Sequence, residues 1–210
     1  MFVLLSSAVS VAFFHALAPD HWVPFVALAR SSRWKMRQLG WVTTLAGIGH
    51  VLSSLLIGLV GLWAGWAVHR LEGVEAWRGG VAIWLLIGFG VAYMLWGFKH
   101  ARHPHPHLSL EQVVAAYAAR RVWILMAVLV FGPCEPLIPL MFLAYKGGVS
   151  AILTVSAVFS LVTVAMVVGQ SCLSYAGVRL VHTDWMERHA HALAGGVIVL
   201  TGLAVLVLGL

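Results

Sequence analysis

The chain has 210 residues, of which 61% are hydrophobic and only 10% are charged. This composition excludes a soluble globular domain and predicts a polytopic membrane protein with no soluble catalytic module, so we do not expect an enzyme. The formal net charge of +6 comes from Lys and Arg in short loops, where positive charge sets membrane orientation, and it does not indicate a nucleic-acid partner.

The first predicted span covers residues 1–30 and is interrupted. Pro19 stands among His15, Asp20 and His21 in an otherwise apolar run. A helix of this length exceeds the hydrocarbon core at about 1.5 Å per residue, and a proline lacks the N–H that would continue it, so we expect a break around Pro19. We expect no cleaved leader, because the first residues lack Lys and Arg.

Two further spans complete the first half of the chain. The loop 30–37 carries four positive charges and no negative ones, and the second span, 39–68, contains His50 after a glycine. Residues 69–79 hold charges of both signs and are predicted to form a loop. The third span is predicted at 80–98.

A histidine-rich loop follows at 99–107, and an amphipathic helix is expected at 108–120. Proline-separated histidines are typical of metal-binding tracts, and we expect weak metal capture on the cytoplasmic side; the alternative is a solvated loop without a role. The candidate residues are His100, His103, His105 and His107.

The second half contains three more spans. The fourth, 121–145, is predicted to break at 132–136, where Gly-Pro-Cys-Glu-Pro interrupts the apolar run. The fifth is expected at 150–178 and the sixth at 192–210. Most Lys and Arg residues fall in the first, third and fifth loops, which predicts a cytoplasmic-membrane protein with both termini outside.

The two halves resemble each other. When residues 23–29 are aligned with 138–144, Asp20 falls on Glu135. After one small gap, Gly49-His50 falls on Gly169-Gln170.

Since three spans lie in each half, the halves would have opposite orientations. The sequence therefore predicts an all-α fold of six transmembrane helices, built as a 3+3 inverted repeat with two broken helices and a site at the midplane. The repeats are 1–98 and 121–210, joined by the cytoplasmic segment 99–120.

Ionisable and polar side chains near the two breaks form one candidate site. Imidazole and carboxylate with an occasional thiolate suit first-row divalent metals, and groups of this kind inside spans usually mark a transport path. We expect a transported ion and no tightly bound cofactor. The candidate ligands are His15, Asp20, His21, His50, Cys134, Glu135 and Gln170.

Each of these residues also has a purely structural interpretation. A single histidine in a span, such as His50, often forms a hydrogen bond between helices. Cys134 and Cys172 singly are typical small packing residues. Asp20 and Glu135 would then pair with histidine or backbone N–H groups.

Two of the motifs resemble a known family. His15-Ala16-Leu17-Ala18-Pro19-Asp20-His21 resembles the His-x(4)-Asp-His signature of the nickel/cobalt transporters, the NiCoT and NicO group, and Gly49-His50-Val51-Leu52-Ser53 resembles that family's Gly-His motif in the following helix. The resemblance implies secondary transport of Ni²⁺ or Co²⁺, with His15, Asp20, His21 and His50 as ligands. Zn²⁺, Fe²⁺ and Mn²⁺ share these donors.

Two alternatives stay open. Pro133-Cys134 resembles the proline–cysteine of the CcdA/DsbD thiol-electron transporters, which implies electron transfer through Cys134 and Cys172; in that family the redox cysteines are symmetry mates, whereas here Cys134 aligns with Pro19. The other is a receptor that hands metal to an enzyme without transporting it. The expected partners are the metal ion, the bilayer, and a second copy or a metallochaperone.

Overall fold

The computed structural model describes the chain apart from residues 66–67, 103–110, 133, 135, 180–183 and 209–210, and apart from the side chains of His69, His100, Arg102, residues 111–119, Asp184 and Glu187. The described residues are almost entirely helical and contain no strand, as the composition predicts. In chain order the helices are α1 (Phe2–Ala16), the 3-10 turn η1 (Pro19–His21), α2 (Val23–Ser31), α3 (Met36–Trp63), α4 (Val68–Arg102), α5 (Glu111–Phe131), α6 (Leu137–Tyr145), α7 (Gly148–Val178), α8 (Asp184–Arg188) and α9 (Ala190–Leu208).

The break in the first span is confirmed. α1 ends at Ala16, η1 follows, and the axis bends by 74° between α1 and the segment from Pro19 to Ser31. Ala18 has φ −55° and ψ 129°, the extended conformation that a following proline favours. The turn places His21 in the interior, where it is buried.

The second predicted break also lies where the sequence places it. α5 ends at Phe131 and α6 begins at Leu137. The N–H of Gly132 still donates to the carbonyls of Val128 and Leu129, at 2.9 and 3.0 Å, and closes the last turn of α5. The helix expected at 108–120 is not separate from this span, because α5 runs through both.

The prediction of a loop at 69–79 is wrong. α4 begins at Val68 and continues without interruption to Arg102. Glu75 and Arg78 therefore lie inside a long helix, and both are buried. Charged residues in the sequence are typical of a loop, but Glu75 and Arg78 form an ion pair one helical turn apart within α4.

The long helices turn apolar side chains outward and small or polar ones inward. On α3 the exposed hydrophobic residues recur every three or four positions, which places them on one face: Trp41, Leu45, Ile48, Leu52 and Leu56. The opposite, buried face contains Thr43, Ala46, Gly47, His50 and Ser54. This arrangement suits a helix that faces lipid on one side and protein on the other.

Four described helices are long and apolar enough to cross a membrane: α3, α4 (as Arg70–Lys99), α7 and α9. The bent pair formed by α1 and the segment 19–31 makes a fifth if it is counted as one span. The molecule therefore has the character of a helical membrane protein, while the predicted count of six spans stays a prediction.

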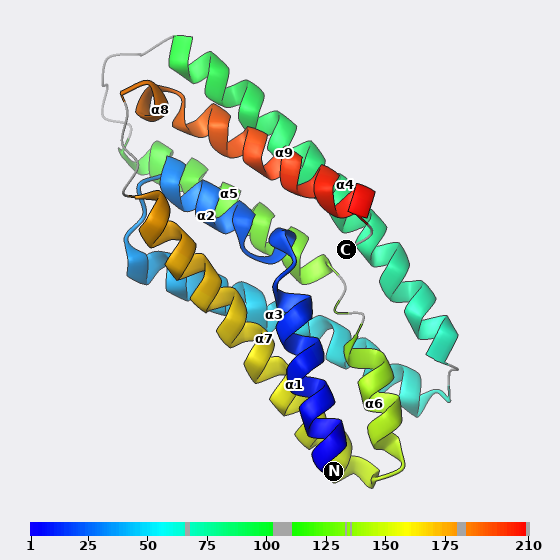
Figure 1. The fold of residues 1–210 in the computed structure, drawn as a ribbon. Coiled ribbons are helices and arrows are strands. Elements are labelled where there is room, and N and C mark those ends of the chain that lie inside the picture. The colour runs from blue at the N-terminus through cyan, green and yellow to red at the C-terminus, as the bar shows by residue number, and fades with distance from the viewer. Residues whose placement is uncertain (66–67, 103–110, 133, 135, 180–183, 209–210) are drawn as a thin grey trace.

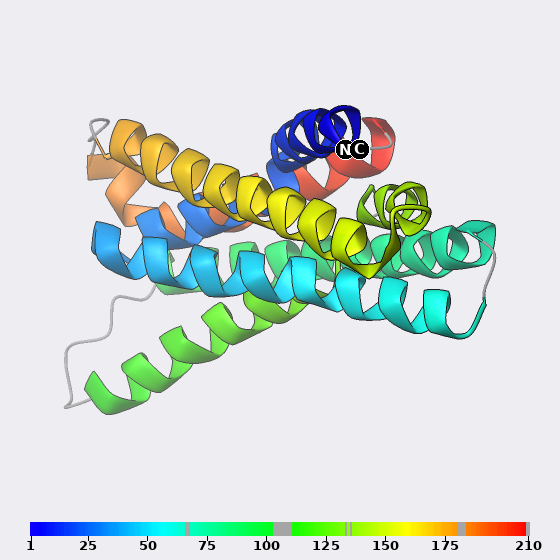
Figure 2. The same ribbon diagram turned by 90° about the horizontal axis from the view of Figure 1, so that it is seen from below.

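The helices pack as two long pairs with the broken helices between them. α3 lies against α7, and α4 lies against α9 along the opposite edge (Figure 1). The half-helices α1 and α6 pack on α7, and α2 packs on α9 (Figures 1 and 2). The two breaks therefore lie in the middle of the bundle.

Glycines allow α4 and α9 to approach closely. A Cβ at Gly97 of α4 would lie 2.3 Å from the backbone nitrogen of Ala192, and one at Gly195 of α9 would lie 2.3 Å from the backbone nitrogen of Met94. No side chain fits at such distances, so these two positions require glycine.

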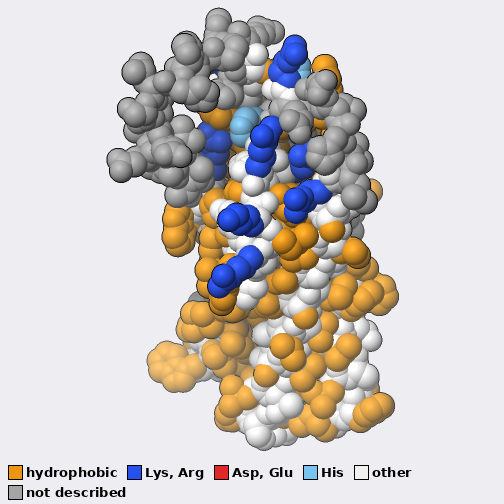
Figure 3. Space-filling view, turned by 90° about the vertical axis from the view of Figure 1, so that its left-hand side faces the viewer, with side chains coloured by type: hydrophobic (Ala, Val, Ile, Leu, Met, Phe, Trp, Pro, Cys, Tyr) orange, Lys and Arg blue, Asp and Glu red, His pale blue; other side chains and the backbone are white. Residues whose placement is uncertain are grey.

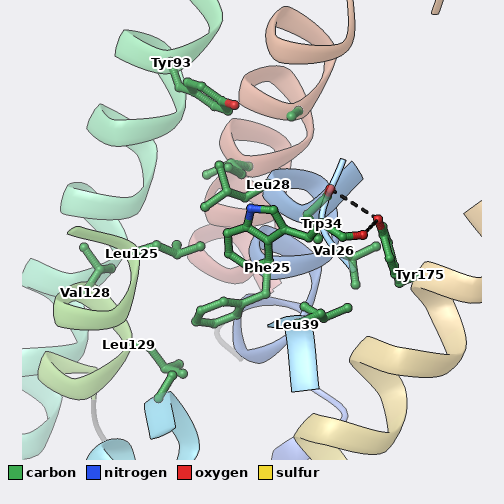
Figure 4. Close-up of a cluster of buried hydrophobic side chains, with 14 of the residues drawn as sticks. Phe25, Val26, Leu28, Trp34, Leu39, Tyr93, Leu125, Val128, Leu129 and Tyr175 are labelled. Atoms are coloured by element: carbon green, nitrogen blue, oxygen red, sulfur yellow. Dashed lines mark hydrogen bonds between the residues drawn. The ribbon is translucent and has the colours of Figure 1, made fainter. Parts of the chain in front are cut away.

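Two apolar clusters flank the breaks. One joins α2, α3, α4, α5, α7 and α9 around Phe25, Leu28 and Leu125, and it includes Tyr175, whose hydroxyl donates to the carbonyls of Ala29 and Trp34 (Figure 4). The other joins α1, α3, α6 and α7 and contains Cys134. Polar groups at the breaks are thus enclosed by apolar packing.

Positive charge gathers at one end of the molecule. Figure 3 shows Lys and Arg side chains over one end of the visible face and hydrophobic side chains over the remainder. Exposed Lys35 and Arg37 lie at the start of α3, and exposed Arg179 follows the end of α7. These side chains come from two separate parts of the chain that lie at the same end of the bundle (Figure 1).

Candidate functional site

Three imidazoles meet where the first helix is broken. His15 lies in the last turn of α1, His21 ends η1, and His50 lies in the middle of α3. The Nε2 atom of His50 is 3.5 Å from Nε2 of His15 and 3.3 Å from Nε2 of His21. The same ring nitrogen of all three histidines therefore faces a common point.

Hydrogen bonds fix which nitrogen of two imidazoles carries the proton. His50 Nδ1 lies 3.0 Å from the carbonyl oxygen of Leu129, which can only accept, so Nδ1 donates. His21 Nδ1 donates to Asp20 Oδ1 at 2.9 Å. Both imidazoles thus direct an Nε2 lone pair toward the common point unless a second proton is bound.

Two lone pairs 3.3 Å apart repel each other. Either a shared proton or a bound cation between His21 and His50 removes this repulsion. An imidazole whose other nitrogen is bonded to a carboxylate or a carbonyl is also the arrangement in which proteins hold metal-ligating histidines. The chemistry of the cluster therefore fits a cation.

Cys134 adds sulfur to the cluster from the second half of the chain. Its Sγ is 3.5 Å from Nε2 of His15, and the ligand atoms of His15, His50 and Cys134 all lie within 4.8 Å of one another. Cys134 is fully buried. The two broken helices thus contribute to one cluster.

The separations match those of a first-row metal site. With metal–nitrogen distances of about 2.0–2.1 Å and a metal–sulfur distance of about 2.3 Å, a tetrahedron has nitrogens about 3.3–3.4 Å apart and a nitrogen about 3.5 Å from the sulfur. In the structure, Nε2 of His50 lies 3.3 and 3.5 Å from the other two nitrogens, and Nε2 of His15 lies 3.5 Å from the Cys134 sulfur. These three separations therefore suit pairs of ligands on one ion, and His15, His50 and Cys134 are the residues whose ligand atoms all lie within 4.8 Å of one another.

A glycine lets the second broken helix reach His50. A Cβ at Gly49 would lie 2.6 Å from a methyl carbon of Val130, so a larger residue here would require the Val130 side chain at the end of α5 to shift. The close approach brings the carbonyl of Leu129 within reach of His50. The Gly-His pair in the sequence therefore has a packing reason as well as a chemical one.

A cavity of about 340 Å³ opens beside the imidazoles. His15, Asp20, His21 and His50 lie along one side of it, and small residues of α4 line the other, among them Ala76, Gly79 and Gly80. Phe25, Leu86 and Leu125 of the apolar cluster in Figure 4 also line it. The cavity is large enough to hold an ion with several water molecules beside the cluster.

The remaining candidate residues fall outside the cluster or outside the described residues. Gln170 donates from Nε2 to the carbonyl of Ala16 at 3.4 Å, beside His15 rather than among the facing nitrogens. Glu135, His103, His105 and His107 lie outside the described residues, as does the side chain of His100. Their proposed roles stay predictions.

The structure shows a buried ion pair next to the site that the sequence analysis did not predict. Glu75 and Arg78 of α4 pair with each other and contact Ser53 and Ser54, on the turn of α3 that follows His50. The available signal was their spacing, because an acid and a base three residues apart share one face of a helix.

Cys134 and Cys172 lie in different parts of the molecule. The backbone N–H of Cys134 donates to Ser54 Oγ at 3.0 Å and to Glu75 Oε2 at 3.2 Å, whereas Cys172 Sγ lies beside Gly40. Gly40 and Ser54 are separated by fourteen residues of α3, which is about 21 Å at about 1.5 Å per residue. A disulfide requires Cα atoms within about 7 Å, so the two thiols are not placed to form one.

Comparisons of the chain with protein-family models, with curated proteins and with solved structures gave no match. The likeness to nickel/cobalt transporters therefore consists of the two sequence motifs alone.

Proposed function

We propose that the protein is a secondary transporter for a divalent transition-metal ion, with Ni²⁺ or Co²⁺ as the substrate that the motifs imply. One observation carries the proposal: three imidazoles and a thiol, from the two interrupted helices and from α3, gather at one place with 3.3–3.5 Å between neighbouring donor atoms. Ionisable groups inside apolar helices are costly and usually line a transport path.

The donor set suits an ion that must also leave. Neutral imidazoles and one carboxylate-supported histidine bind first-row ions well, and fewer thiolates than in a structural zinc site favour release. The adjoining cavity gives a hydrated ion space beside the imidazoles. Both properties belong to a transport site more than to a closed structural one.

The packing also agrees with the proposed six-helix inverted repeat. In this repeat α7 is the counterpart of α3, and α9 is the counterpart of α4. Each helix packs against its own counterpart. In such a fold, two symmetry-related broken helices meet at the midplane and hold the substrate. The basic end of the molecule would face the cytoplasm, which would place both termini outside.

Ion flux into liposomes tests the proposal. Purified wild-type protein should transport Ni²⁺ or Co²⁺, and His15→Ala, Asp20→Ala and His50→Ala should each reduce the rate by about 10- to 100-fold, because ligands and their supporting carboxylates carry metal affinity. His189→Ala is the matched control, since His189 precedes α9 and its side chain contacts Trp185, outside the cluster. Wild-type rates in all three site variants would refute the proposal.

No observation favours thiol-electron transfer. The two cysteines are free and lie beside different turns of α3, so one membrane-embedded disulfide does not connect them. Thiol trapping of the wild-type chain should recover Cys134 and Cys172 as separate free thiols.

A further inference from the structure

α4 contributes a buried ion pair that touches no metal-binding side chain of the cluster. Glu75 is completely buried, and Arg78 is 6% exposed. A buried pair of charges persists only when its remaining donors and acceptors are satisfied. The partners of this pair therefore indicate its role.

Arg78 bonds the end of α5. Its Nη2 donates to the carbonyls of Val130 and Gly132 at 3.1 and 3.3 Å. The last carbonyls of a helix have no partner within that helix, and water is scarce at membrane depth. Arg78 thus supplies hydrogen bonds that the break in the second half removes.

Glu75 bonds the other side of the same break. Its Oε2 accepts the N–H of Cys134 at 3.2 Å and the hydroxyl of Ser54 at 2.8 Å. The Ser54 hydroxyl oxygen also accepts the N–H of Cys134, at 3.0 Å. Carbonyls before the break and an N–H after it are therefore held by one ion pair from another helix.

The residue held in this way is the one that brings sulfur to the cluster. Cys134 N contacts Glu75 and Ser54, while Cys134 Sγ lies 3.5 Å from His15 Nε2. We infer that Glu75 and Arg78 are positioning residues, which hold the break between α5 and α6 so that the Cys134 thiol reaches the metal. The inference rests on the proposed function, because it assigns Cys134 to the metal site.

Cobalt absorption tests the inference on the full-length protein. Co²⁺ bound by a thiolate gives a sulfur-to-metal charge-transfer band that imidazole ligands do not give. Wild type should show the band, and Cys134→Ser should lose it. Arg78→Lys and Glu75→Gln should still bind Co²⁺ but lose at least about half of the band per bound ion, since a ligand must stay within about 0.5 Å of its position.

The control is Glu72→Gln, which makes the same chemical change at an exposed position on α4. It should keep the full band. Full band intensity in both Arg78→Lys and Glu75→Gln would overturn the inference. If these two variants do not fold, Ser54→Ala removes only one hydroxyl from the network and should weaken the band in the same way.

Thiol alkylation separates this inference from the proposed function, because it needs no metal. In a Cys172→Ser background, Cys134 should react slowly with N-ethylmaleimide, and Arg78→Lys or Glu75→Gln should accelerate the reaction about tenfold by local opening of the break. A wild-type chain without the cobalt band would refute the thiolate–metal contact, and the alkylation rates would then decide the role of the ion pair by themselves. Equal alkylation rates in wild type and both variants would overturn the positioning role of the ion pair.

Discussion

Two imidazoles at the centre of the molecule each donate a hydrogen bond from Nδ1 to an oxygen atom. This bond directs the Nε2 atom of each ring toward the other. His21 donates to Asp20, and His50 donates to the carbonyl of Leu129. The carbonyl is part of the backbone and cannot be changed by substitution, but the carboxylate can. Asp20 is therefore the residue through which the basicity of the cluster is best varied.

Asp20→Asn should lower metal affinity by about 10- to 100-fold, the usual cost of losing a carboxylate that supports a ligating histidine. The amide keeps the shape but loses the negative charge beside His21. Equilibrium dialysis of the purified protein with Ni²⁺ measures the effect, with Glu72→Gln as the matched control on an exposed turn of α4. Equal affinities of Asp20→Asn and wild type would show that the carboxylate does not support the site.

Metal affinity should also fall as the pH is lowered. A metal ion binds neutral imidazoles and a thiolate, so each bound proton must leave before the ion enters. Protons therefore compete with Ni²⁺ at His15, His21, His50 and Cys134. Dialysis at several pH values should show tighter binding at higher pH and proton release into a weakly buffered solution; affinity that does not change with pH would contradict ligation by these groups.

At the scale of helices, the broken spans depend on their neighbours. α3 presents Gly49 to α5 and His50 to the cluster, while α4 packs on α9 through glycines and holds the second break through its ion pair. The packing of α4 on α9 is the contact that a single methyl group disturbs most clearly.

Gly97→Ala should destabilise the protein by about 1–3 kcal/mol or more, because its new methyl group would overlap the backbone of α9. Gly88→Ala is the control on the same helix, since a Cβ there meets nothing within 4 Å. That change should be neutral or stabilising by up to about 1 kcal/mol through helix propensity. Denaturant unfolding in detergent measures both; equal stability of the two variants would contradict the tight packing.

Sequence patterns located the breaks and the histidines because these signals are local. Pro19 lacks the N–H that would continue the preceding helix, and the polar residues of this stretch and His50 are conspicuous in apolar runs. The ion pair of α4 could not be located in this way, because charged residues such as Glu75 and Arg78 are equally typical of a solvated loop. Their burial depends on the carbonyls and N–H of a break more than fifty residues later in the chain.

At the scale of the whole molecule, apolar surfaces face outward and charges gather at one end. The helical, membrane-protein character of the molecule follows directly from its composition. The number of spans and the inverted repeat depend on how distant segments pair, and the alignment of the two halves predicts this pairing without establishing it. The contact of Cys134 with His15 brings donor side chains of both halves together at the candidate site.

Labelling at two lysine positions tests the orientation. In a chain with Cys134→Ser and Cys172→Ser, we expect Lys146→Cys to react with an impermeant maleimide in intact cells. Lys35→Cys should react only after the membrane is permeabilised, since basic loops remain in the cytoplasm. Both positions are exposed at helix ends, so the substitutions are matched. The reverse pattern would place both termini inside.

The central claim is that both broken helices bind one metal ion, and X-ray absorption at the metal edge of the Ni²⁺-loaded, full-length protein tests it most directly. The account predicts a shell of imidazole nitrogens with one sulfur, loss of the sulfur in Cys134→Ser, and fewer imidazoles in His50→Ala. A spectrum with only oxygen neighbours, or one that neither substitution alters, would contradict it.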